Sequence, residues 1–205
     1  MKTKAISLFL AGGFALSGCS SLTYQDPDAV EVVTIDFGST DLQKLAGGMA
    51  NSMIAAPRLT SYPQTGDAIL VYMGGVENRT SEHIDTQAIT DSIKTALLKS
   101  GKFRLTASNQ GQQEIEDQVR FQQGSGRVDP ATAKAYGRQF GADVVVYGRL
   151  ISIEKSDGRT IESGGYKKDD VYYKFTLECV DIETGEILWI DEEEIRKFEE
   201  TGLFG

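Results

Sequence analysis

Hydrophobic residues recur at helical spacing in two segments of the chain. The first segment covers residues 40–55, with Ser39 or Thr40 as the predicted N-cap and Pro57 beyond its end. Its apolar stripe consists of Leu42, Leu45, Ala46, Met49 and Met53. Residues 85–100 carry a second stripe, followed by Gly101 where a left-handed C-cap is favoured: Ala88, Ile89, Ile93, Ala96 and Leu97. Both segments are predicted to be amphipathic helices.

Two further helices are predicted from weaker signals. Residues 112–122 form a polar segment that is compatible with a helix. Residues 131–140 follow Asp129, which suits an N-cap, and Pro130, which suits the first helical position; Gly141 closes the segment.

The remaining apolar runs predict strands. Residues 67–73 are nearly continuously apolar, as in a strand covered on both faces, and residues 76–80 are predicted to be a polar exit loop. Residues 103–105 fit a short edge strand. Residues 142–154 form a long strand whose opening, residues 144–147, again has the pattern of a strand buried on both faces.

Two more strands complete the pattern. Residues 171–181 alternate with a period of two, and a tight turn at Thr184 and Gly185 leads to residues 187–197. The last three strands are predicted to form an antiparallel meander. The fold class is therefore α/β (α+β), with helices flanking a small mixed sheet in one globular domain at residues 37–205.

The N-terminus has the pattern of a bacterial lipoprotein. Lys2 and Lys4 precede an apolar run that ends at Leu16-Ser17-Gly18-Cys19, and that run is too short to cross a bilayer. We expect a signal peptide at residues 1–18, acyl chains on Cys19, and a short linker within residues 19–36. Ser20 favours the outer membrane with the body in the periplasm; the alternative is a plain signal peptide with a chance cysteine.

The composition limits the classes of binding partner and the roles open to the cysteines. The net charge is −9, so an acidic surface argues against nucleic acid and against anionic lipid as partners. After acylation of Cys19 the only other cysteine is Cys179, which is either a free thiol nucleophile or, as its place in the alternating pattern favours, a core residue.

No catalytic or metal-binding set emerges from the sequence. His83 is the single histidine, and one histidine with one core cysteine cannot supply a zinc site. The acidic residues 191–194 and 199–200 could form a calcium site or a pair of catalytic carboxylates. Alternatively, they are charges that prevent edge-to-edge association of an edge strand, which is the interpretation that we favour. The glycine pairs form no phosphate-binding motif. We therefore expect no metal, no cofactor and no enzymatic activity.

Several segments in order resemble the LpoB lipoproteins, outer-membrane activators of class A penicillin-binding proteins. They are residues 76–80, the helix from Thr86, residues 101–105, residues 141–147 and residues 184–189. The resemblance covers roughly residues 37–197 and implies a small domain related to the N-terminal domain of TolB. It also implies docking on a regulatory domain of the peptidoglycan synthase, which stimulates glycan polymerisation.

One departure from that family concerns the linker. The best-known members carry a long proline-rich linker, whereas residues 20–30 here extend at most about 35 to 40 Å. The alternative is an envelope lipoprotein of the same fold with a structural or secretion-related client. A pore is disfavoured because Lys174 and Glu178 face outward on the best alternating strand.

A docking surface is predicted around the helix at residues 131–140. Arginine and tyrosine are enriched at binding hot spots, and the hypothesis names Arg127, Tyr136, Arg138 and Tyr147. The competing interpretation makes Tyr147 a core residue and the arginines solvated.

Overall fold

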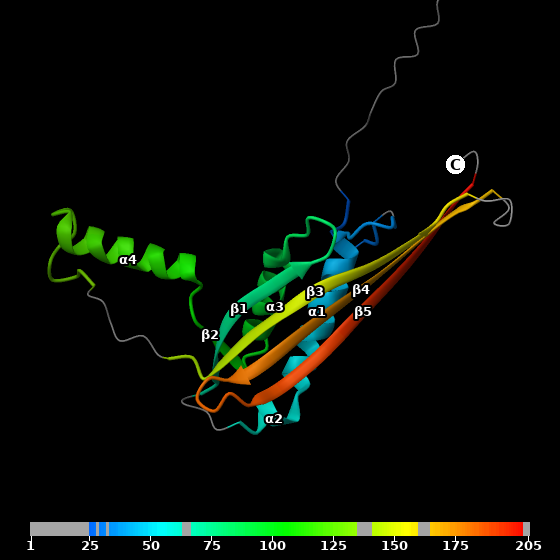
Figure 1. The fold of residues 1–205 in the computed structure, drawn as a ribbon. Coiled ribbons are helices and arrows are strands. Elements are labelled where there is room, and N and C mark those ends of the chain that lie inside the picture. Colours follow the sequence, from blue (N-terminus) through cyan, green and yellow to red (C-terminus); the bar gives the residue numbers. More distant parts are fainter. Residues whose placement is uncertain are drawn as a thin grey trace, which may run out of the picture.

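The computed structural model describes residues 25–27, 29–31, 33–62, 67–134, 141–159 and 165–202. They contain a five-stranded sheet in the order β2-β1-β3-β4-β5 (Figure 1). The strands are β1 (Ile69–Arg79), β2 (Phe103–Leu105), β3 (Val144–Asp157), β4 (Lys167–Asp181) and β5 (Ile187–Thr201). β1 is parallel to β2 and β3, whereas β3, β4 and β5 are antiparallel neighbours, so the sheet is mixed and ends in the predicted meander.

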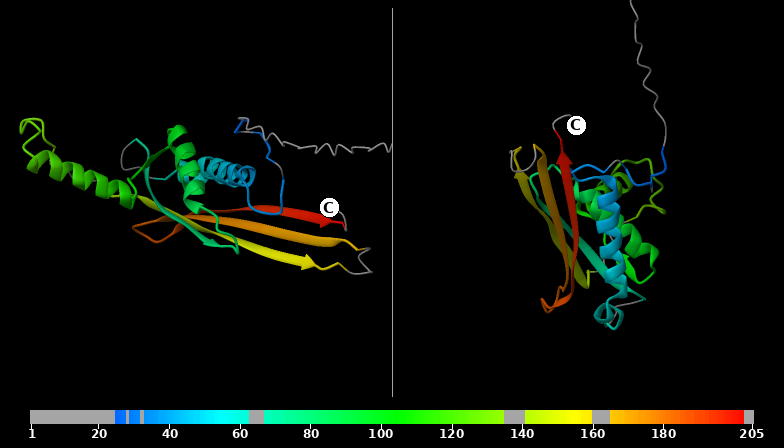
Figure 2. Two further views of the ribbon diagram at one scale, coloured as in Figure 1. Left: turned by 90° about the horizontal axis from the view of Figure 1, so that it is seen from above. Right: turned by 90° about the vertical axis from the view of Figure 1, so that its right-hand side faces the viewer.

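Two long helices cover one face of this sheet. They are α1 (Ser39–Ala55) and α3 (Thr86–Lys99), which pack on each other and on β5 and β1 respectively (Figure 2). The short α2 (Pro57–Thr60) follows α1, and α4 (Asn109–Gly124) projects from the body without extensive contact with another described element. The predicted fold class, α+β with helices flanking a mixed sheet, is confirmed.

The predicted ranges of the two covering helices are close to the observed ones, but the N-cap of α1 is Gly38 and not Ser39 or Thr40. In α1 the Gly38 N–H donates to Asp41 Oδ2 at 2.9 Å, and in α3 the Gln87 N–H donates to the capping Asp85 carboxylate at 3.0 Å. Gly101 closes α3 at a φ of 71°, a conformation that glycine adopts without strain. The predicted stripes fill the core: Leu45, Met49, Met53, Ile89, Ile93 and Leu97 are 0–1% exposed.

The sheet face beneath the helices is apolar along β4. Tyr173, Phe175, Leu177 and Cys179 are at most 1% exposed, so the core interpretation of Cys179 is confirmed. The prediction that residues 144–147 are buried on both faces is wrong. Val144 and Val146 are fully buried but Tyr147 is 42% exposed, because helices cover only one face.

The end of β1 also differs from the prediction. Residues 76–79 are not an exit loop, because β1 continues to Arg79 beside β3 after an irregularity between Met73 and Gly75. The glutamate and arginine at the end of β1 concealed this strand, since polar residues are common where one face of a strand meets water.

The predicted helix at residues 131–140 is not formed in its described part. The Asp129 side chain accepts from the Ala131 N–H at 2.9 Å, but the chain makes only a turn through Lys134. Residues 135–140 lie outside the described residues. The polar helix predicted at 112–122 is confirmed as α4.

Close contact between β3 and β4 makes Gly148 a sensitive position. A Cβ atom there would lie 2.1 Å from the Thr176 carbonyl oxygen and 2.7 Å from Leu177 Cδ2. We expect Gly148→Ala to lower the free energy of unfolding by about 2 kcal/mol, because the backbone must shift. Gly47→Ala is the control: its Cβ meets nothing within 4 Å in the interior of α1, so it should raise stability by about 0.5–1 kcal/mol. Urea unfolding of both variants checks this, and equal effects would contradict it.

Candidate functional site

The uncovered face of the sheet is ordered into rows by strand pairing. Nearest the β4–β5 turn, Val145 of β3 pairs with Val180 of β4, which pairs with Ile187 of β5. In the next row Tyr147, Glu178 and Ile190 lie side by side. We call these six residues the apolar rows, since Glu178 is the only charged member.

The apolar rows expose a considerable hydrophobic surface. Tyr147, Ile187 and Ile190 are 42%, 47% and 51% exposed, and Ile182 in the adjoining turn is 52% exposed. Scattered exposed apolar residues are ordinary, but a contiguous group with a polar border is typical of an interaction site.

Tyr147 is held in place by its neighbour in the row. Its hydroxyl donates to Glu178 Oε2 at 3.2 Å, and Arg149 Nη1 lies 3.8 Å from Glu178 Oε1. Burial and the Glu178 carboxylate raise the pKa of the Tyr147 hydroxyl, which therefore stays protonated and remains a donor. A tyrosine fixed in this way loses little conformational entropy when a partner covers it.

Charged residues border the apolar rows on the side away from the β4–β5 turn. This charged belt comprises Arg149, Thr176 and Glu192 in one row and Ile151, Lys174 and Glu194 in the next. Lys174 Nζ lies 2.6 Å from Glu192 Oε2, and the Thr176 hydroxyl, 2% exposed, donates to Glu192 Oε1 at 3.4 Å. An apolar centre with a charged rim is the common anatomy of a protein interface.

The structure describes two residues of the predicted docking surface, Arg127 and Tyr147, and places them on different parts of the fold. Tyr147 lies on the open sheet face, and its interpretation as a core residue is wrong. Arg127 is exposed beyond the end of α4, a helix of 16 residues and so about 24 Å long that projects away from the sheet (Figure 1). Tyr136, Arg138 and Cys19 lie outside the described residues.

Sequence reasoning missed Ile187 and Ile190. An irregularity between Cys179 and Val180 shifts the pairing with β5, so the alternation of the sequence does not reveal which side chains of β5 face outward. The one available signal is the unbroken apolar run at residues 187–190 in an edge strand.

The other candidate groups do not assemble into a reaction site in the described part of the chain. His83 is exposed in the loop before α3, and no described group of His, Cys, Asp and Glu side chains is placed to hold a metal ion. A cavity of about 660 Å³ lies at the β4–β5 turn. Two of its carboxylates are engaged, since Asp143 accepts from the Leu70 N–H at 2.8 Å and Asp181 from the Tyr62 hydroxyl at 2.6 Å. No helix among the described residues is long and apolar enough to span a membrane.

An α+β domain with a rimmed, uncovered sheet face has the features of a protein that binds another protein. A sequence profile described as "Peptidoglycan-synthase activator LpoB" matches residues 41–195, and the chain therefore belongs to the LpoB family. A search of curated protein sequences finds no significant match.

Solved structures with similarity to this chain include three of LpoB. The C-terminal domain from Salmonella enterica is 17% identical with a TM-score of 0.43, and that from Escherichia coli is 17% identical with a TM-score of 0.41. Each alignment covers 76% of this chain and 98% of the other. The NMR structure of E. coli LpoB is 15% identical with a TM-score of 0.39, over 98% of this chain and 88% of that one.

The environment of Cys179 yields a test of its assignment to the core. Burial, followed by the charge of Asp181, raises the pKa of this thiol from 9.0 to about 12. At pH 8 the folded protein should therefore carry roughly a thousandfold less thiolate than the unfolded chain and react correspondingly slowly with iodoacetamide. As pH rises above 9 the unfolded thiol ionises first, so this group lowers the stability of the fold in alkali. Rapid alkylation of the folded body at pH 8 would contradict the assignment.

Proposed function

We propose that this chain is an outer-membrane lipoprotein that binds a class A penicillin-binding protein and accelerates its peptidoglycan synthesis. The observation that carries the proposal is the family match over residues 41–195, most of the folded domain. Attachment is through acyl chains on Cys19 after removal of residues 1–18, and the domain at 37–205 then lies in the periplasm. Acyl chains contribute roughly 0.8 kcal/mol for each buried methylene, so such an anchor is stable.

The apolar rows are the surface best suited to receive the synthase. Tyr147, Ile187 and Ile190 offer exposed apolar area on a rigid sheet, and the charged belt offers Arg149 and Lys174 beside Glu178 and Glu192. Tyrosine and arginine dominate the energetics of many interfaces. We assign the regulatory domain of the synthase to this face.

The arm formed by α4 and the segment that follows it supplies a second proposed contact. Arg127 is exposed at the far end of the arm, and Tyr136 and Arg138 follow it in the sequence. Since α4 stands clear of the sheet, a partner seated on the apolar rows meets Arg127 only if it also extends along the arm.

Activation without catalysis requires only a difference in affinity. If the lipoprotein binds the active conformation of the synthase more tightly than the inactive one, it shifts the population toward the active state. A tenfold difference in affinity corresponds to about 1.4 kcal/mol of coupling, which a single well-packed aromatic side chain can supply.

Glycan polymerisation provides the direct test of this function. Adding the soluble body from Ser20 onward to the class A penicillin-binding protein of the same organism should accelerate polymerisation saturably, because binding shifts the conformational population. The measurement is the rate of lipid II consumption against the concentration of the body. No binding and no change in rate would leave the chain as an envelope lipoprotein with a structural or secretion-related client.

The apolar rows can be tested with a matched pair of substitutions in β3. Tyr147→Ala should weaken binding to the synthase at least about tenfold, as expected for a central aromatic contact. Ile153→Ala is the control, since Ile153 is 52% exposed on the same face of the same strand but lies beyond the charged belt. Both variants should change the free energy of unfolding by less than about 1 kcal/mol, because both side chains are exposed. Equal affinities for the synthase would exclude the apolar rows.

The arm has its own test. Arg127→Ala and Arg138→Ala should each weaken binding by about threefold to tenfold if the partner reaches the arm, as measured by titration calorimetry. Unchanged affinity in both variants would remove the arm from the interface and leave the apolar rows unaffected.

A further inference from the structure

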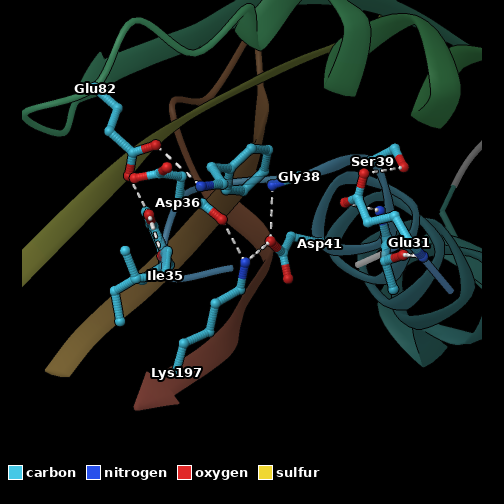
Figure 3. A network of polar contacts seen from close by, with 11 residues as sticks. Glu31, Ile35, Asp36, Gly38, Ser39, Asp41, Glu82 and Lys197 are labelled. Atoms are coloured by element: carbon cyan, nitrogen blue, oxygen red, sulfur yellow. Dashed lines mark hydrogen bonds and ion pairs between the residues drawn. The ribbon is translucent and has the colours of Figure 1, made fainter. Parts of the chain in front are cut away.

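The segment that leads into α1 contacts β4 at Tyr173 and β5 at Lys197, and it falls into two parts. Residues 35–38, which we call the inner strap, lie against buried groups of the domain. The described residues 25–27, 29–31 and 33–34, which we call the outer strap, lie at the surface. Figure 3 shows the contacts of both parts.

Phe37 is the centre of the inner strap. Its N–H donates to Glu82 Oε2 at 3.0 Å, and its ring meets that of Tyr173 edge to face, with centroids 5.5 Å apart. The Tyr173 hydroxyl, fully buried, donates to the same Glu82 carboxylate. Burial and this bond raise the pKa of Tyr173, so the donor persists at every physiological pH. The inner strap is thus joined to β4 and to the loop before α3.

Lys197 joins the inner strap to β5. Its ammonium group donates to the Asp36 carbonyl oxygen at 2.5 Å and forms an ion pair with Asp41 in the first turn of α1 (Figure 3). The two side chains are only 11% and 10% exposed. Removing one partner of such a pair leaves a buried charge without compensation, which makes opening costly.

The contacts that Glu31 makes in the outer strap are exposed to solvent. The Glu31 carboxylate accepts from the Thr40 N–H at 3.2 Å and from the Ser39 hydroxyl at 3.0 Å, and these bonds lower the pKa of Glu31. Val30 and Val33 are 71% and 72% exposed, so this part buries little apolar surface. Hydrogen bonds in contact with water contribute little, and the outer strap opens at low cost.

We propose that the inner strap is the fixed point through which the lipid anchor holds the domain, whereas the outer strap detaches and lengthens the tether. This inference rests on the proposed acylation of Cys19. With the outer strap detached, the 15 residues from Ser20 to Thr34 extend to roughly 50 Å, more than residues 20–30 alone provide.

The fixed point also sets the orientation of the domain. The inner strap enters at the N-terminal end of α1, whereas the β4–β5 turn, where the apolar rows begin, lies at the other end near α2 (Figure 1). The apolar rows are therefore at the end of the domain remote from the proposed anchor.

Proteolysis of the acylated full-length protein in phosphatidylethanolamine vesicles tests the two-part strap. A protease that cleaves before aspartate meets Asp26 in the outer strap and Asp36 in the inner strap. Cleavage before Asp26 should be at least about tenfold faster than cleavage before Asp36, because proteolysis follows the population of open chain. Mass spectrometry of the released fragments gives both rates. Equal rates would overturn the proposal.

Adjacent residues of β5 provide a matched pair of variants. Lys197→Met removes the contacts with Asp36 and Asp41 and should raise the rate before Asp36 at least about tenfold. Arg196→Met removes an equal charge and an exposed ion pair with Asp170 on the other face, and should change that rate by less than about twofold. An unchanged rate in Lys197→Met, or equal rates in the two variants, would refute the role of Lys197.

A second variant covers the case in which Lys197→Met does not fold. Asp41→Asn combined with Lys197→Met leaves no unpaired charge, retains an amide oxygen for the Gly38 N–H, and still frees the Asp36 carbonyl. It should likewise increase cleavage before Asp36 while its circular dichroism stays unchanged. None of these proteolysis measurements involves a synthase, so their outcome does not depend on whether the chain activates one. Conversely, if the two-part strap is refuted, the polymerisation assay still tests the proposed activation.

Discussion

The fold depends on the burial of one face of a five-stranded sheet by only two long helices. β4 contributes Tyr173, Phe175, Leu177 and Cys179 to that face, all nearly inaccessible to water, and α1 and α3 cover them with their apolar stripes. In the described part of the chain no helix covers the other face, so outward side chains of the meander such as Tyr147, Ile187 and Ile190 are exposed. The surface proposed for docking and the stability of the domain thus arise from the same one-sided packing.

The open face is ordered because the strands are paired residue by residue. Val145, Val180 and Ile187 form one row and Tyr147, Glu178 and Ile190 the next, and the charged side chains then form a belt. In an antiparallel sheet opposite residues point to the same side, so rows that are remote in the sequence become one continuous surface. This arrangement gives a member of the LpoB family a continuous surface on the open face of its sheet.

The attachment of the N-terminal segment and the apolar rows lie in different parts of the domain. Glu82, Tyr173 and Lys197 hold the chain that leads to Cys19, and they lie away from the β4–β5 turn where the apolar rows begin. This separation is compatible with the proposed membrane anchor and with the proposed docking on the apolar rows. In that proposal a short linker is sufficient, because the detached outer strap and the domain itself both add reach.

The sequence by itself determined the elements whose signals are local. The stripes of α1 and α3, Gly101 and the alternation in β4 each follow from neighbouring residues, and with the turn at Gly185 they were enough for the fold class and the meander. Tertiary structure alone decided the rest. Whether Tyr147 is core or surface depends on which face of the sheet the helices cover, and the partners of Lys197 and Phe37 lie in segments remote in the chain. No local pattern encodes such contacts, because they exist only after the sheet has closed against its helices.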